Sequence, residues 1–242
     1  MEDLSISYCF TMEDGKQHIF DLLIGGETLD LKKNISGKMP SWINLEFHQC
    51  SNCTLSTATH MYCPLSLSLV DIVQCFNKFM SYEDVQLDVI TKERKISQKT
   101  TIQRGISSLM GLVMATSGCP YTKFFKPMAR FHLVMANEEE TLYRAASMYM
   151  LAQYYLNQEG RVADIELNGL KKIYNDIQVV NAAVTQRLRT AAEADSSINA
   201  IILLDTYAQA IPFIIEKSIN VIRYLFLPYL SGENRTKDNM NI

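Results

Sequence analysis

The sequence carries little net charge of either sign, and this absence limits the partners that it can attract through long-range electrostatics. Lys and Arg together number 23 and Asp and Glu 26, which gives a formal net charge of -3 and a sequence pI of about 5.8. A domain that binds nucleic acid usually presents a basic field or patch to the phosphate backbone. We therefore expect no nucleic-acid partner.

The chain also lacks a recognisable leader and an uninterrupted apolar run. The first four residues, Met-Glu-Asp-Leu, have neither the basic start nor the apolar stretch of a secretory signal. The longest apolar stretches lie in residues 198–230, where polar and charged residues recur too often for a transmembrane helix. The interrupting residues are Asp205, Gln209, Glu216, Lys217 and Arg223. We expect a cytoplasmic protein without a transmembrane segment.

Common catalytic signatures are missing as well. The sequence has no glycine-rich phosphate loop, no Gly-x-Ser-x-Gly elbow, no EF-hand pattern and no His-Glu-x-x-His pair. What it does have is a concentration of soft ligands in residues 48–63, which hold three of the six cysteines and two of the four histidines. In a reducing compartment, clustered cysteines are more often metal ligands than disulfide partners.

The spacing of these ligands predicts a zinc site. The ligands that we expect are His48, Cys50, Cys53 and Cys63, because a Cys-x-x-Cys turn directs two sulfurs at one ion and zinc prefers tetrahedral thiolate and imidazole ligation. His60 is the alternative imidazole, since it lies three residues before Cys63. Reduced cysteines in an ordinary loop, or a redox pair, are the alternatives to metal binding.

Whether such a zinc ion is structural or catalytic depends on the number of protein ligands. Four ligands leave no position for water, whereas three would leave room for an activated water. The only carboxylate close enough to serve as a base is Glu46, and the His-x-Glu element of zinc deaminases is absent. We expect a structural site.

Residues 1–103 predict an antiparallel β-sheet with one helix. Asp14-Gly15 between apolar segments within residues 5–31 is typical of a hairpin turn, and 85–100 forms a second hairpin candidate. Residues 42–47 alternate like a strand, which would deliver His48 and Cys50 to the same side. Apolar residues at three- and four-residue spacing predict a helix over 65–81.

Residues 104–230 predict a helical domain. The pattern indicates one helix from Thr101 to about residue 116, in which Gly105 and Gly111 suggest the close approach of another element. An irregular segment follows over 121–133, and then a helix from 138 to 158 with Asn137 as its N-cap. Two long helices should follow over 164–194 and 196–230, packed as an antiparallel hairpin, with Pro212 kinking the second. We expect a mobile tail over 231–242. The predicted fold class is thus α+β, a small antiparallel sheet with a zinc-knuckle loop followed by a C-terminal helical bundle.

A second group of polar residues flanks the irregular segment. Cys119 beside His132 would suit a nucleophile and its base, and Arg130 with Arg144 would suit an anionic ligand. Arg144 also lies four residues after Glu140, where it could form an ordinary helical ion pair. Cys119 follows a helix rather than beginning one, so no helix dipole would lower its pKa.

Four strings give the chain a resemblance to a known family. They are Phe-His-Gln-Cys-x-x-Cys from Phe47, Ser-Gly-Cys-Pro from Ser117, Met-Ala-Arg-Phe-His from Met128 and Tyr-Arg-Ala-Ala-Ser-Met-Tyr from Tyr143. With these strings the chain resembles an uncharacterised bacterial domain-of-unknown-function family over residues 5 to about 210. The resemblance implies a bacterial cytoplasmic protein and no particular activity.

Two functions from different classes remain. The first is a zinc-stabilised, non-enzymatic interaction or regulatory protein, which would bind a protein partner or form a homodimer through its apolar C-terminal helices. The second is a zinc- or thiol-dependent hydrolase that uses residues 48–63 or 119–144. A weaker third possibility is a small-anion sensor that uses Arg130 and Arg144.

Overall fold

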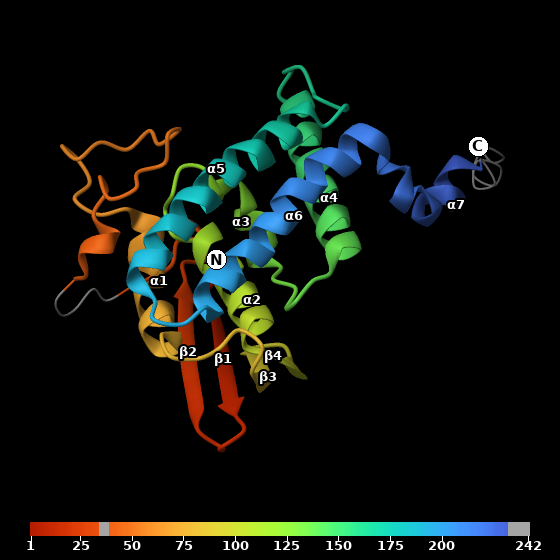
Figure 1. Cartoon of the computed structure of the whole chain (residues 1–242). Helices are drawn as coiled ribbons and strands as arrows, with labels where there is room; N and C mark the ends of the chain where they lie inside the picture. The colour runs from red at the N-terminus through yellow and green to blue at the C-terminus, as the bar shows by residue number, and fades with distance from the viewer. Residues whose placement is uncertain (34–38, 232–242) are drawn as a thin grey trace, which may run out of the picture.

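A four-stranded antiparallel sheet forms the base of the molecule. The computed structural model describes residues 1–33 and 39–231, so the predicted tail beyond Ser231 lies outside the described residues. The strands are β1 (Leu4–Met12), β2 (Gln17–Ile24), β3 (Asp84–Thr91) and β4 (Lys95–Thr101), in the sheet order β2-β1-β3-β4. Both predicted hairpins are therefore present, β1 with β2 and β3 with β4 (Figure 1).

One face of this sheet is buried and explains the period-two pattern of the strands. In the central strand β1, the side chains of Ile6, Tyr8 and Phe10 are almost fully buried, while those between them are not. Opposite β1, Leu87 of β3 lies against Phe10 in the register. Gly15, with a φ of 82°, makes the β1–β2 turn, a conformation that glycine adopts without strain.

Helices α1 (Pro64–Phe76) and α2 (Ile102–Ala115) contribute to the main core with this buried face. Phe76 of α1 meets Phe10 edge to face, with their ring centroids 4.9 Å apart. Gly105 of α2 lies against the same ring, since a Cβ added there would be 2.7 Å from Cε1 of Phe10. A close approach of another element at Gly105 was predicted from the position of this glycine on the apolar face of the helix, and the structure confirms it.

The chain between the sheet and α1 is not the strand that the sequence predicted over 42–47. It forms a short 3-10 helix, η1 (Ser41–Ile43), followed by turns, and its only ladder contact among the described residues is an isolated bridge between Asn44 and Tyr62. Trp42, Ile43 and Leu45 are all buried, so the apolar residues do not alternate between two faces. The strand prediction was wrong here because Trp42 and Ile43, which are adjacent in the chain, both pack into the main core.

Four helical segments carry the described chain from residue 122 to residue 191, within the predicted helix over 164–194. They are η2 (Thr122–Phe125), α3 (Lys126–Arg130), α4 (Glu138–Gln158) and α5 (Asn168–Ala191), and then α6 (Ser196–Ser218) runs back along α5. The predicted cap of α4 is confirmed: Asn137 Oδ1 accepts from the amide of Glu140 at 2.9 Å, and Glu140 Oε2 accepts from the amide of Asn137 at 2.8 Å. The α5–α6 hairpin is also confirmed (Figure 1).

The predicted single helix over 196–230 is shorter than expected. It ends as α6 at Ser218, beyond Pro212, and continues as a 3-10 segment, η3 (Ile219–Phe226), and a final turn, α7 (Leu227–Leu230). In Figure 1 this C-terminal segment extends away from the rest of the molecule. The segment Ser196–Ile215 of α6 is long and apolar enough to cross a membrane, with a mean hydropathy of 1.6. Core helices of soluble proteins can have the same length and hydropathy, so these two properties are weak evidence for a transmembrane helix.

The core joins the sheet and the helical part of the chain. The main cluster combines the sheet, α1 and α2 with Val180, Val184 and Leu188 of α5 and Ala200 and Ile201 of α6. A smaller cluster lies farther along α4, α5 and α6. The coarse expectation of an antiparallel sheet with helices is confirmed, and the division at residue 103 remains a prediction.

Candidate functional sites

Four of the six cysteines line one small cavity. Cys50 and Cys53 come from the turn after η1, Cys63 is the N-cap of α1, and Cys119 follows α2. The cavity has a volume of about 20 Å³, roughly the space of one water molecule. All four cysteines are free thiols.

The two histidines of the predicted zinc site lie outside this lining. His48 is exposed, has a φ of 45°, and packs its ring edge to face against Phe47 with a centroid distance of 4.7 Å. His60 is also exposed, and its Nδ1 lies 2.9 Å from the hydroxyl of Thr59. Within residues 1–33 and 39–231, no group of three or more His, Cys, Asp or Glu side chains is already arranged to hold a metal ion.

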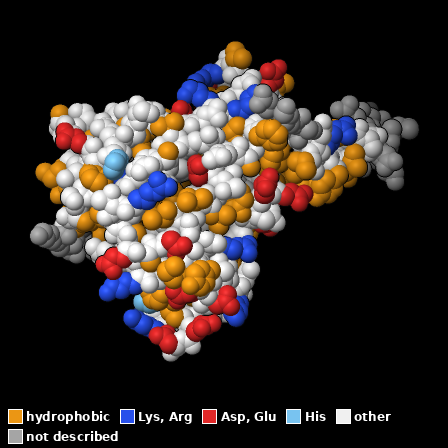
Figure 2. All heavy atoms as spheres, in the orientation of Figure 1, with side chains coloured by type: hydrophobic (Ala, Val, Ile, Leu, Met, Phe, Trp, Pro, Cys, Tyr) orange, Lys and Arg blue, Asp and Glu red, His pale blue; other side chains and the backbone are white. Residues whose placement is uncertain are grey.

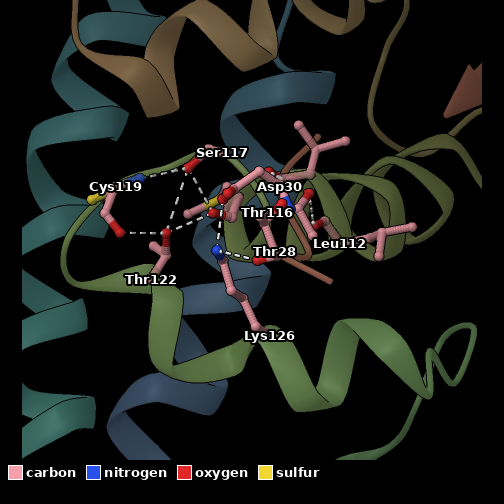
Figure 3. A network of polar contacts seen from close by, with 10 residues as sticks. Thr28, Asp30, Leu112, Thr116, Ser117, Cys119, Thr122 and Lys126 are labelled. Atoms are coloured by element: carbon pink, nitrogen blue, oxygen red, sulfur yellow. Dashed lines mark hydrogen bonds and ion pairs between the residues drawn. The ribbon is translucent and has the colours of Figure 1, made fainter. Parts of the chain in front are cut away.

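Hydrogen bonds hold the Ser117–Pro120 turn that brings Cys119 to the cavity. The Ser117 hydroxyl donates to the carbonyl of Met114 at 2.7 Å and accepts from the amide of Cys119 at 3.3 Å. The Thr122 hydroxyl donates to the same Met114 carbonyl at 2.6 Å. Figure 3 shows this network, with the Cys119 sulfur pointing away from the hydroxyl groups. Gly118, at a φ of 88°, permits the turn.

The Cys50–Cys53 turn is attached to the helical part of the chain. The Tyr121 hydroxyl donates to the carbonyl of Asn52, and the Asn52 side-chain amide donates to the carbonyl of Asp176 on α5 at 3.1 Å. Cys63 is fixed by its amide, which donates to the carbonyl of Ile43 at 2.8 Å. The four thiols therefore come from segments that separate contacts hold in place.

Arg187 of α5 also lines the cysteine cavity, and sequence reasoning missed it. Its side chain is 1 % exposed, and it donates to the carbonyls of Trp42 and Asn44 at 2.8 Å and of Leu45 at 3.0 Å. The sequence does contain a signal for the burial of Arg187, because this residue follows the buried positions Val180 and Val184 of α5 at helical spacing. The guanidinium takes the place of strand partners for these carbonyls.

The environment of two of the thiols disfavours their charged form. Burial is the largest of the causes that raise the pKa of Cys50 to about 12, and the nearby thiols of Cys63, Cys119 and Cys53 are smaller causes. Burial also raises the pKa of Cys119. A neutral thiol is a poor nucleophile, so without a bound cation Cys50 and Cys119 are unreactive at neutral pH.

A second, larger cavity of about 190 Å³ lies among the helices and is mostly apolar. Its walls come from α2, from residues 122–136, and from α4, α5 and α6. The polar or charged side chains that line it are Arg104, Ser107, Ser108, Thr122, His132, Thr141, Arg144, Tyr174, Asn181 and Tyr207. Within the described chain, no Asp or Glu belongs to this lining.

His132 is a neutral imidazole in this wall. Burial, with the Arg144 cation as a smaller cause, lowers its pKa from 6.5 to about 4. Its Nε2 lies 2.5 Å from the hydroxyl of Tyr8, which lies 3.0 Å from the hydroxyl of Ser108. The Ser108 oxygen also accepts the amide of Met135 at 3.0 Å, so we assign the Ser108 proton to Tyr8 and the Tyr8 proton to His132. His132 then carries its own proton on Nδ1.

Arg144 is a half-buried cation whose helical ion pair with Glu140 does not form. Its Nη2 instead donates to the carbonyls of Met128 at 2.7 Å and Phe131 at 3.1 Å. Burial lowers its pKa, though a guanidinium remains charged at any physiological pH. Its Nη1 and Nε make no hydrogen bond in the described part of the chain, so these donors remain for a ligand.

The four residues of the predicted second site are divided by the structure. His132 and Arg144 share the large cavity, whereas Cys119 lines the cysteine cavity. Arg130 lines neither, and its guanidinium lies over the exposed ring of Phe131, 5.8 Å from the centroid. The structure thus separates Arg130 from Arg144, the two residues of the expected anion site. It also separates Cys119, the expected nucleophile, from His132, its expected base.

Asn181 is a further residue that sequence reasoning missed. It is 1 % exposed and lines the large cavity, where its Nδ2 donates to Asp205 Oδ1 at 3.1 Å. Its Oδ1 has no hydrogen-bond partner among the described residues. The signal in the sequence was a polar residue at helical spacing between Ile177 and Val184, in the buried stripe of α5.

Comparison with family models matches residues 6–227 to a family described as a domain of unknown function (DUF6901). The chain belongs to this family. The match confirms the expectation of a family without an assigned activity. No curated protein and no solved structure matches the chain. The geometry of this family member therefore has to supply the functional argument.

Proposed function

We propose that this protein is a non-enzymatic, ligand-binding regulator whose helical cavity holds a small carboxylate with an apolar body. The observation that carries the proposal is the composition of the cavity wall. It is apolar over most of its area, carries guanidinium groups of Arg104 and Arg144, and includes no acidic side chain among the described residues. Such a wall favours an occupant that is apolar except for one negative group.

The size of the cavity limits the occupant. An engineered apolar cavity of about 150 Å³ binds benzene, so one of 190 Å³ suits an aromatic ring with a short acidic side chain or a short alkanoate. Phenylacetate and hexanoate are representatives of this class. Larger cofactors, such as nucleotides, do not fit this volume.

The polar groups favour a carboxylate over a neutral ligand. Arg144 offers free N–H donors on Nη1 and Nε, and a charge-assisted hydrogen bond from a guanidinium to a carboxylate oxygen is stronger than one to a neutral acceptor. Neutral His132 adds no charge but has one ring nitrogen that is not engaged by Tyr8. The unpaired Oδ1 of Asn181 is an acceptor that a carboxylate alone does not satisfy, and a hydroxyl donor on the apolar body of the occupant would give it a hydrogen bond.

The separation of Cys119 from His132 supports a binding role over the thiol-dependent hydrolase. A thiol nucleophile needs its base within about 2.6–3.2 Å or slightly more. Here the two residues line different cavities, and the imidazole is instead bonded to Tyr8.

The test is thermal unfolding with phenylacetate, hexanoate and their neutral amides. A ligand at 100 times its dissociation constant stabilises the folded state by about 2.7 kcal/mol, which for a chain of this size raises the unfolding temperature by about 5–10 °C. We expect the carboxylates to produce this rise and the amides to fail. If no carboxylate of this size raises the unfolding temperature at millimolar concentration, the proposal is wrong.

A matched pair of variants tests the role of the cation. Arg144→Gln removes the less exposed of the two arginines that line the cavity, whereas Arg130→Gln removes a guanidinium on α3 that lies outside the cavity. For each variant, the quantity to compare is the rise in unfolding temperature caused by the ligand, which subtracts any change in basal stability. We expect Arg144→Gln to abolish the rise and Arg130→Gln to retain it.

A second candidate function, homodimerisation through the C-terminal segment, is favoured by a separate observation. Large apolar side chains on η3 and α7 are exposed, and hydrophobic side chains gather along this part of the surface in Figure 2. The exposed residues are Val221, Tyr224, Leu225, Phe226, Leu227, Tyr229 and Leu230. A single copy leaves these side chains uncovered, and a second copy would remove them from water.

Sedimentation velocity tests the dimer. We expect the wild-type chain to sediment as a dimer at tens of micromolar, and the double variant Leu225→Asp/Leu227→Asp to sediment as a monomer. A wild-type monomer at that concentration would remove this candidate. The ligand-binding proposal does not depend on the result.

A further inference from the structure

The cysteine cavity combines residues that are distant in the sequence and chemically alike. Cys50 and Cys53 form one tight turn, in which the amide of Cys53 donates to the carbonyl of Cys50 at 2.9 Å. Cys63 and Cys119 approach the same small space from the start of α1 and the end of α2. Four thiols around one cavity match the number that a closed tetrahedral zinc site requires.

The buried cation beside these thiols is a second, independent observation. Arg187 is 1 % exposed, and none of the ion pairs in the described part of the chain includes it. Its hydrogen bonds go only to neutral carbonyls. An unpaired charge in a protein interior is costly, so the site needs negative charge nearby. Among the described residues that line the cavity with Arg187, the ionisable groups are the four cysteines and Tyr121, and the Tyr121 hydroxyl is used as a donor to the carbonyl of Asn52.

We propose that Cys50, Cys53, Cys63 and Cys119 bind one Zn²⁺ ion as four thiolates. Binding forms four Zn–S bonds and releases four protons to solvent, with no change in oxidation state. The resulting centre has a net charge of -2, which gives the Arg187 guanidinium the counter-charge that it otherwise lacks. The thiols line the cavity but are not yet directed at one centre. Metal binding therefore requires each cysteine to rotate about χ1, the torsion that places its sulfur.

This ligand set replaces His48 with Cys119 and changes what the metal does in the fold. A site made of residues 48–63 alone would only close a loop. With Cys119, the ion joins that loop to the end of α2, which also lines the large cavity. Four protein ligands leave no position for water, so the centre is structural.

The first test is metal content and coordination of the wild-type chain, purified under reducing conditions without added zinc. We expect about one zinc per chain. X-ray absorption should show four sulfur ligands at about 2.3 Å, whereas the His48 set would give three sulfurs and one nitrogen near 2.0 Å. Zinc well below one per chain, or a nitrogen ligand in the shell, would overturn the proposal, and this measurement needs no variant to fold.

Variants then identify the individual ligands through cobalt substitution. Co²⁺ bound to four thiolates has intense visible bands that report its tetrahedral sulfur environment. We expect Cys119→Ser to lose these bands and to retain less than about one fifth of the wild-type zinc. His48→Ala and Cys9→Ser, which change a residue outside the lining, should retain both. If His48→Ala loses the metal while Cys119→Ser retains it, the ligand set proposed here is wrong. The carboxylate measurements address a different cavity, so failure of one proposal leaves the other intact.

Discussion

Acidification should destabilise this protein through His132 before its carboxylates begin to protonate. In the folded chain the pKa of His132 is lowered to about 4 by burial and by Arg144, while in the unfolded chain it returns to about 6.5. Between these values the unfolded state binds a proton that the folded state does not. Stability is therefore complete above about pH 6.5 and falls as the pH is lowered toward 4.

The size of the effect follows from the two pKa values. Between pH 7 and pH 5 the unfolded imidazole changes from mostly neutral to almost fully protonated, whereas folded His132 remains about nine-tenths neutral. The linked loss of unfolding free energy over this interval is about 2 kcal/mol. For a chain of this length, that corresponds to a fall of about 4–8 °C in unfolding temperature.

The assay is urea unfolding of the wild type and His132→Gln at pH 7 and pH 5. Glutamine can still bond to the Tyr8 hydroxyl but cannot titrate, so its stability should change by about 2 kcal/mol less than that of the wild type over this interval. Burial also lowers the pKa of His18, and this contribution has the same sign, but it is common to both proteins and cancels in the difference. An equal loss in wild type and variant would refute the assignment of His132 as a buried neutral base.

Four substitutions test the packing, the capping and the buried guanidinium. Gly105→Ala should lower the unfolding free energy by about 1–2 kcal/mol, because the added Cβ would lie 2.7 Å from the Phe10 ring. Gly111→Ala is the control: its added Cβ would have its nearest contact at 3.4 Å, so the change should be neutral or slightly stabilising. Equal effects of the two substitutions in urea unfolding would contradict this reasoning. Asn137→Ala removes the α4 cap and should cost about 1 kcal/mol, and an unchanged midpoint would argue against the capping box. Arg187→Met leaves two buried carbonyls and one partly buried carbonyl without a donor and should cost about 3 kcal/mol or more, whereas a loss below about 1 kcal/mol would show that water replaces the guanidinium.

The parts of the fold that the sequence predicted well are those set by local patterns. The β1–β2 hairpin followed from Asp14-Gly15 between apolar segments, and the start of α4 followed from Asn137 and Glu140 three residues apart. Both signals act within a few residues, so no distant contact can change their meaning. The close approach at Gly105 was also predictable, although its partner, Phe10, was not.

The error at residues 42–47 has a tertiary cause. Alternation predicted a strand, yet these residues bury their apolar side chains together and give their carbonyls to Arg187, which lies far along the chain. No pattern within residues 42–47 encodes that donor. The predicted end of α1 was also late, because the helix ends at Phe76 instead of Ser81.

The candidate sites show the same limit. Cys-x-x-Cys drew attention to a loop that lines the cysteine cavity, but the spacing of residues in the sequence could not indicate that Cys119 lines the same cavity and that His48 is exposed. His132 and Arg144 were identified by residue type and do share a cavity wall. Their cavity depends on how α2, α5 and α6 pack, which residue spacing alone does not determine.

The bonds from Arg187 also imply an order of events during synthesis. They join the Arg187 side chain to backbone carbonyls 142 to 145 residues earlier in the chain, so the carbonyls of residues 42–45 leave the ribosome long before their donor is made. The N-terminal strands can pair meanwhile, but the turn at Trp42 has to wait for the docking of α5. A nascent chain arrested before residue 187 should thus be cut readily by protease in this turn, and the full-length chain should resist.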